Sequence, residues 1–234
     1  EGGVRWLEYA GGDPMDAANW TVHQAFSLEG TAQIDGPYDI SGDGNVDDLY
    51  MSRRDLHNDS VSDGDQDFAY LSPPADPKNT WLKTQIDTNV KPNLHVTGDF
   101  FGNGNKDVVL TDGFTSPGGL FIYDVGNSFA KTTIRQNRDY YGVKAIPQGS
   151  GRDLIYAFDR SNDYHELFEY SPDTGVYEIR HQIYSDMTGG SIKVAEIPPL
   201  VDLDGDGTKE LVLPSGNDPK NTNNGSIKLL RVVG

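Results

Sequence analysis

A short pattern of alternating acidic residues and glycines, followed at once by an apolar strand, recurs along this 234-residue chain. Its most complete copy is VDLDGDGTKELVLPSG, which starts at Val201. Related copies are YDISGDGNVDDLYMS, which starts at Tyr38, and GDFFGNGNKDVVLTDG, which starts at Gly98. A fourth copy, AIPQGSGRDLIYAF from Ala145, keeps only the glycine-rich turn, Asp153 and the apolar residues after it. Repetition of this kind indicates an array of similar structural units.

The rest of each unit also repeats. Two apolar strands follow each loop, and a third strand then begins with an aromatic residue, at Trp81, Phe129 or Tyr177. A further strand leads into the next loop, which makes four strands in a unit of roughly 50 residues. No segment shows a helical period. The sequence therefore predicts an all-β fold, a β-propeller built of four-stranded blades.

The blade boundaries follow from the positions of the loops. Within a single domain, 1–234, we expect blades at 31–90, 91–140 and 141–189 and partial blades at 1–30 and 190–234. If the two ends completed one blade, VRWLEY near the N-terminus and SIKLLRVV near the C-terminus would compete for one strand position. Two alternatives stay open: a small propeller of four or five blades with a spare strand, or a segment of a larger, seven-bladed propeller.

The charge of the chain restricts its partners. The net charge is −17 at pH 7, so the surface repels phosphate backbones and anionic lipid, and we expect no nucleic-acid partner. No apolar run is long enough for membrane insertion. Sequons for N-glycosylation at Asn19, Asn58 and Asn224 agree with a secreted, extracellular protein, and the chain contains no cysteine.

The acidic loop differs from an EF-hand. An EF-hand requires a bidentate Glu at loop position twelve and a helix on each side, whereas position twelve counted from Asp202 is Leu213, within a strand-like ELVLP. The motif D-x-D-G-D-G-x-x-[DE]-L-V instead resembles the FG-GAP/VCBS repeats of calcium-binding β-propellers, a family that includes integrin-type heads and secreted lectin and lyase propellers. The resemblance extends from about Val4 to Val233.

That resemblance implies Ca²⁺ as the cofactor, held by side chains at loop positions one, three, five and nine and by the backbone carbonyl at position seven. The best site implied consists of Asp202, Asp204, Asp206 and Glu210 with the carbonyl of Thr208. The second consists of Asp39, Ser41, Asp43 and Asp47 with the carbonyl of Asn45. A third, weaker or empty because Phe101 displaces one oxygen, consists of Asp99, Asn103, Asn105 and Asp107. The competing interpretation is an ordinary turn in which Asp and Gly serve only the backbone.

The expected function is recognition of a carbohydrate or polysaccharide ligand, as a lectin-like module. Trp6, Trp20 and Trp81 together with twelve Tyr are able to form stacking platforms for sugar rings. Trp20 and Trp81 recur at a fixed strand position, which favours packing between strands for these two. No motif distinguishes a third possibility, a protein-interaction head that joins a partner chain or additional blades.

The enzymatic alternative is a polysaccharide lyase or a related, dehydratase-type eliminating enzyme that acts on carbohydrate. The segment IRQNRDYYGVK is basic within an acidic chain, and lyases of acidic polysaccharides combine a cation that holds the uronate carboxylate with a tyrosine that transfers the proton. The weak catalytic candidates of this segment are Arg135, Arg138, Tyr140, Tyr141 and Lys144. A solvated connector between two blades is the preferred interpretation of the same residues.

Overall fold

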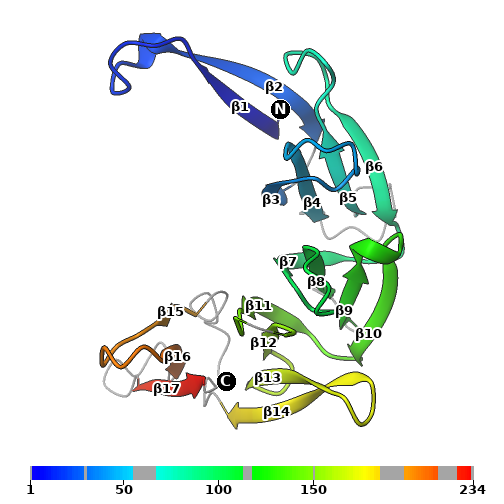
Figure 1. Cartoon of the computed structure of the whole chain (residues 1–234), viewed down its shortest axis with the longest axis vertical. Helices are drawn as coiled ribbons and strands as arrows, with labels where there is room; N and C mark the ends of the chain where they lie inside the picture. The colour runs from blue at the N-terminus through cyan, green and yellow to red at the C-terminus, as the bar shows by residue number, and fades with distance from the viewer. Residues whose placement is uncertain are drawn as a thin grey trace. The chain divides into compact units, whose positions relative to one another are not determined.

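The computed structural model describes residues 2–28, 31–54, 67–112, 118–149, 151–184, 198–215 and 226–232. Over these residues the chain forms seventeen β-strands and two short 3₁₀ helices, η1 (Ala17–Asn19) and η2 (Val125–Asn127) (Figure 1). The predicted all-β class is confirmed. The described part of the chain contains no helix long and apolar enough to cross a membrane. Two compact units divide the chain, Glu1–Val90 and Lys91–Gly234.

The first unit contains a two-stranded and a four-stranded antiparallel sheet. The smaller sheet pairs β1 (Gly2–Tyr9) with β2 (Trp20–Leu28). The larger sheet has the order β3 (Thr31–Tyr38), β4 (Asp48–Arg54), β5 (Asp67–Ser72) and β6 (Leu82–Asp87). The core of this first unit consists of Leu28, Met51, Ala69 and Leu71, with Phe26 and Trp81 packed against them.

The second unit contains three antiparallel sheets in which each strand pairs with its sequence neighbours. The first has the order β7 (Pro92–Gly98), β8 (Asp107–Asp112), β9 (Gly119–Asp124) and β10 (Ala130–Gln136). The second consists of β11 (Tyr140–Ile146), β12 (Leu154–Asp159), β13 (Tyr164–Ser171) and β14 (Val176–Tyr184). The third consists of β15 (Leu200–Val201), β16 (Lys209–Ser215) and β17 (Ser226–Val232). Three of the five sheets of the chain therefore contain four strands, the number expected for one repeat.

The sheets of the second unit pack face to face, so their middle strands are buried on both sides. All six residues of β12 are buried, whereas β10, at a sheet edge, is almost entirely exposed. One core cluster joins Val109 and Ile122 to Ile155 and Phe168 of the next sheet. A second cluster joins Tyr156 to Leu211 of the third sheet. Burial of each such side chain stabilises the unit by about 1.5–3 kcal/mol, which explains why the middle strands read as continuous apolar runs.

Candidate metal centre

The most complete acidic loop connects β15 to β16 and is closed by its own aspartate. The backbone amides of Gly205 and Gly207 donate hydrogen bonds to the two carboxylate oxygens of Asp202, over 2.7 and 2.9 Å. Both glycines have positive φ angles, 77° and 89°, a conformation that residues with a Cβ adopt only at a cost. The sequence thus dictates this turn locally, through the alternation of Asp and Gly.

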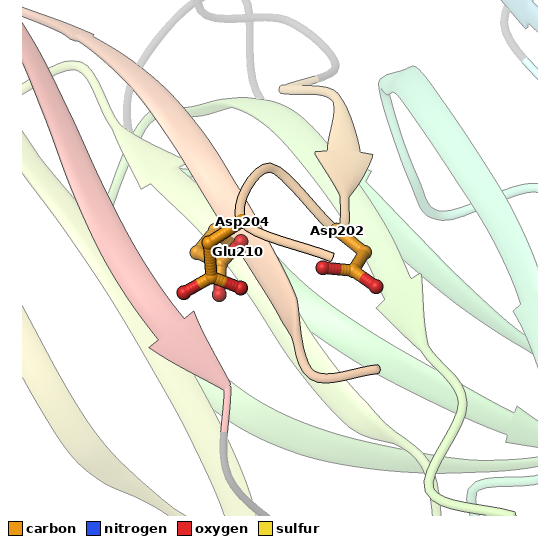
Figure 2. A group of neighbouring side chains, drawn as sticks. All are labelled: Asp202, Asp204 and Glu210. Carbon is orange, nitrogen blue, oxygen red and sulfur yellow. The ribbon is translucent and has the colours of Figure 1, made fainter. Parts of the chain in front are cut away.

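Within this loop three acidic side chains converge. Asp202, Asp204 and Glu210 each place one carboxylate oxygen within 4.8 Å of the others (Figure 2). Figure 2 shows Asp204 and Glu210 together, with the Asp202 carboxylate facing them across the loop. Among the described residues this is the one group of three or more acidic, His or Cys side chains close enough to share a metal ion.

Glu210 is the buried member of the group. Glu210 is the second residue of β16 and is only 6% exposed. Oε2 accepts a 3.0 Å hydrogen bond from the amide of Leu203, whereas Oε1 is buried and has no hydrogen-bond partner. A buried carboxylate oxygen without a donor is unfavourable. A cation at the convergence of the three carboxylates would satisfy it.

The fourth predicted carboxylate of this loop, that of Asp206, has protein partners. Asp206 accepts a 2.8 Å hydrogen bond from the amide of Thr208, and its Oδ2 contacts Nη2 of Arg231 on β17. Nη1 of the same arginine lies 3.8 Å from Oδ2 of Asp204. Asp206 thus faces Arg231 and is not a member of the converging group. Sequence reasoning did not include Arg231, because it lies 21 residues beyond Glu210.

The loop that follows β3 has the same turn. The amides of Gly42 and Gly44 donate to the two oxygens of Asp39, over 2.9 and 3.2 Å, and Asn45 donates to Asp43 through its amide, over 2.8 Å, and its side chain, over 3.2 Å. The buried carboxylate at the start of β4 belongs to Asp48.

Asp48, and not Asp47, thus holds the place that Glu210 holds in the best loop. Oδ2 of Asp48 accepts hydrogen bonds from the amides of Ile40 and Ser41, over 2.8 and 2.6 Å. Counting offsets from Asp39 selected Asp47, because this loop has one more residue before its strand. The usable signal is the acid directly before the apolar pair, as in DL, DV and EL. Partial burial and the charges of Asp43, Asp48 and Asp39 raise the pKa of Asp47, so it too lies beside the loop carboxylates.

The third loop, between β7 and β8, is closed by Asp99 in the same way as the other two. Asp99 accepts 2.9 Å hydrogen bonds from the amides of Asn103 and Gly104, and Asn103 accepts one of 2.9 Å from the amide of Asn105.

Asp107 is fully buried in this loop. It accepts hydrogen bonds from the amides of Phe100 and Phe101 on one oxygen and of Val125 on the other. Burial raises the pKa of Asp107 to about 6 despite these donors. With three amides on its two oxygens, Asp107 offers less to a metal than Glu210 does.

The fourth, degenerate loop is tied to the third. The carboxylate of Asp153 accepts a 2.9 Å hydrogen bond from the amide of Asp99. The hydroxyl of Tyr177, the aromatic residue near the start of β14, donates to the carbonyl oxygens of Phe100 and Asp153, over 2.9 and 2.8 Å. The guanidinium of Arg152 lies 3.5 Å from the centre of the Tyr170 ring. This loop therefore fixes its neighbour through hydrogen bonds and an aromatic contact.

The residues of the lyase alternative are held by protein partners. Tyr140 is fully buried, and its hydroxyl donates a 2.6 Å hydrogen bond to Glu166. Burial, followed by the contact with Glu166, raises the pKa of Tyr140 far above its usual value. A buried phenol with a raised pKa loses its proton less readily near neutral pH than an exposed one does.

The other candidates of this segment have different environments. Arg138 forms a 3.4 Å ion pair with the buried Asp159, and the guanidinium of Arg160 lies 5.5 Å from the ring centre of the half-buried Tyr141. Lys144 is half-buried, and its pKa is lowered by burial and by the charge of Lys209. Arg135 lies exposed on β10.

The three tryptophans occupy different environments. The indole nitrogens of Trp6 and Trp81 both donate to the carbonyl of Pro77, over 3.2 and 3.1 Å, and Trp6 stacks on His23 with ring centres 4.4 Å apart. Trp81 also packs against the core of the first unit. Trp20 is 37% exposed at the start of β2, and its ring packs on that of Tyr9 across the β1–β2 pair, with ring centres 4.8 Å apart.

Comparison with known proteins adds no identification. No protein-family model matches the chain, and no curated protein matches it. Of the three sequons, Asn19 donates its side-chain amide to the carbonyl of Asp13 over 2.9 Å. The other two asparagines, Asn58 and Asn224, lie outside the described residues.

Proposed function

We propose that this chain is, or belongs to, a secreted calcium-stabilised β-propeller of the FG-GAP/VCBS type that binds carbohydrate. The observation that carries the calcium part is the buried Oε1 of Glu210, which has no hydrogen-bond partner, on a side chain that converges with Asp202 and Asp204. Only oxygen ligands are offered there, and Ca²⁺ takes six to eight oxygens, whereas zinc favours nitrogen and sulfur.

Calcium would act here as a structural ion. When bound, it supplies a double positive charge that offsets the repulsion of three converging carboxylates. Asp202 closes the turn through the amides of Gly205 and Gly207, and Glu210 anchors the same loop to β16 through Leu203. Because the native loop binds the ion and the unfolded chain does not, calcium would stabilise the fold by mass action.

Calorimetric titration of Ca²⁺ into the chelator-treated chain tests this proposal. Glu210→Gln should weaken binding by at least about tenfold, because it replaces the one buried ligand charge with a neutral amide. Glu169→Gln makes the same chemical change on the exposed side of β13 and should leave binding unaltered. If the wild-type chain takes up no calcium, or Glu210→Gln binds as tightly as wild type, the calcium proposal is wrong.

The carbohydrate part is supported by an exposed pair of rings on the β1–β2 sheet. Tyr9 and Trp20 are cross-strand neighbours, their ring centres lie 4.8 Å apart, and they are 43% and 37% exposed. Their polar atoms already have partners, since the Tyr9 hydroxyl donates to the carbonyl of Gly12 and the Trp20 indole to that of Pro14. The exposed ring surfaces are therefore free for the apolar face of a sugar.

A glycan array probed at saturating calcium, followed by titration of any saccharide that binds, tests the second part. Trp20→Ala should weaken binding by roughly tenfold, the upper range for one aromatic contact. Leu82→Ala, at an exposed aliphatic residue of β6, is the matched control. Absence of binding to any glycan, or equal binding by Trp20→Ala and wild type, would contradict carbohydrate recognition through this platform.

A further inference from the structure

The three acidic loops differ at one position outside the loop itself. In each, the acid that begins the second strand of its sheet lies beside a residue of the third strand. Asp48 accepts a hydrogen bond from the hydroxyl of Ser72. The residue after Asp107, Val108, pairs with Tyr123 of the antiparallel strand β9. Asp107 therefore lies beside Asp124. Glu210 pairs directly with Arg231. The same site in three related loops thus carries a hydroxyl, a carboxylate and a guanidinium.

Arg231 is the only one of the three that brings a cation to its loop. Nη2 contacts Oδ2 of Asp206, and Nη1 lies 3.8 Å from Oδ2 of Asp204. These three side chains are 48%, 40% and 56% exposed, respectively, so the guanidinium is able to leave without opening the core. Asp206, which has the closer contact with Arg231, is not part of the group formed by Asp202, Asp204 and Glu210.

We propose that Arg231 is an internal competitor for the metal, which lowers the affinity of the Asp202–Glu210 loop for Ca²⁺. The proposal rests on the calcium function proposed above. Binding of the ion releases the guanidinium from Asp204 and Asp206, and Asp206 then joins the ligands. Arg231 thereby sets the calcium concentration at which the loop fills, a property that the loop motif alone does not determine.

The electrostatic argument gives the direction and the size of the effect. The guanidinium neutralises carboxylate charge that would otherwise attract the ion, and it repels a divalent ion that approaches within a few ångströms. Exposure to solvent weakens both effects but leaves a unit charge at this range worth roughly a factor of ten in affinity for a divalent ion. Salt bridges on an exposed surface are individually weak, which allows a metal with several oxygen ligands to displace this one.

The experiment compares calcium titrations of the full chain carrying substitutions at Arg231. Arg231→Ser, which introduces the residue type found at the equivalent position beside Asp48, should raise calcium affinity roughly tenfold. Arg231→Gln should act in the same direction, and it serves as a second variant of similar length. Arg231→Lys keeps the charge and should stay within about threefold of wild type. Lys209→Gln, which removes one charge from β16 outside these contacts, should change affinity less than Arg231→Ser does.

The double variant Arg231→Ser/Glu210→Gln assigns the effect to this loop, because the gain should disappear in it. If wild type binds calcium and both neutral variants bind no more tightly, the role of Arg231 is refuted while the calcium function stands. If neither wild type nor the neutral variants bind calcium, the calcium function itself fails and the inference fails with it. Binding by Arg231→Ser alone would show that the arginine excludes calcium from the loop, and it would contradict the proposed calcium function of the wild-type chain.

Discussion

The carboxylate of Asp153 accepts a 2.9 Å hydrogen bond from the backbone amide of Asp99. The Asp153 loop has lost the acidic residues of its relatives, yet it retains the one acid that precedes its strand. That acid now fixes the start of the adjacent loop. The acid before the strand thus has two roles: Glu210 is a proposed metal ligand, whereas Asp153 connects two loops.

Replacement of Asp153 by alanine should destabilise the second unit. The substitution removes the acceptor for the amides of Asp99 and Gln148, and a buried donor left without an acceptor costs about 1–3 kcal/mol. Urea unfolding measures the loss. Asp173→Ala, in an exposed turn, should change the free energy of unfolding little, and a comparable loss in both variants would contradict the role of Asp153.

Asp107 should make stability depend on pH. Burial raises its pKa to about 6 in the folded chain from 3.8, so the folded state holds its proton over a range in which the unfolded state has released it. Stability should therefore fall as pH rises from about 4 to about 6, by at most about 3 kcal/mol for this group. Unfolding in calcium-free buffer across this range measures the slope. Asp107→Asn should lack this contribution, and an unchanged slope in the variant would refute the assignment.

Tyr140→Phe should lower stability and leave ligand binding intact. The hydroxyl donates to the buried Glu166, so its removal leaves a buried carboxylate with one donor fewer, at a cost of about 1–3 kcal/mol. Chemical unfolding and calcium titration of the same variant separate the two effects. A polyuronate-cleaving activity that is abolished by this substitution, with stability unaltered, would instead revive the lyase alternative.

Chelation of calcium should lower the melting temperature of the wild-type chain. The ion binds only the folded loop, so bound calcium raises the free energy of unfolding. This stabilisation grows with the ratio of free calcium to Kd and is about 2.7 kcal/mol when free calcium is a hundred times Kd. Chelation removes it. Thermal melting with and without EGTA measures this shift. Glu210→Gln should show a much smaller shift, and equal shifts in both chains would place the stabilising calcium elsewhere.

Several features of the candidate site required the tertiary structure. Counting along the chain selected Asp47, whereas the hydrogen bonds of Ile40 and Ser41 go to Asp48. Position in the repeat favoured packing for Trp20, and only the structure shows that its ring both packs on Tyr9 and stays 37% exposed. Tyr140 stands in a basic, connector-like segment, yet its ring is part of a core that joins two sheets. The propeller, the calcium and the carbohydrate remain predictions.

The sequence by itself determined the local structure of this protein. Alternating Asp and Gly create each turn, because glycine tolerates positive φ and the aspartate accepts the freed amides, and short apolar runs between turns become strands. Only the tertiary structure decided which carboxylate is buried and which cation reaches it. Arg231 meets Asp206 because β17 pairs with β16, and pairing between strands depends on the burial of whole sheets, which no short motif encodes.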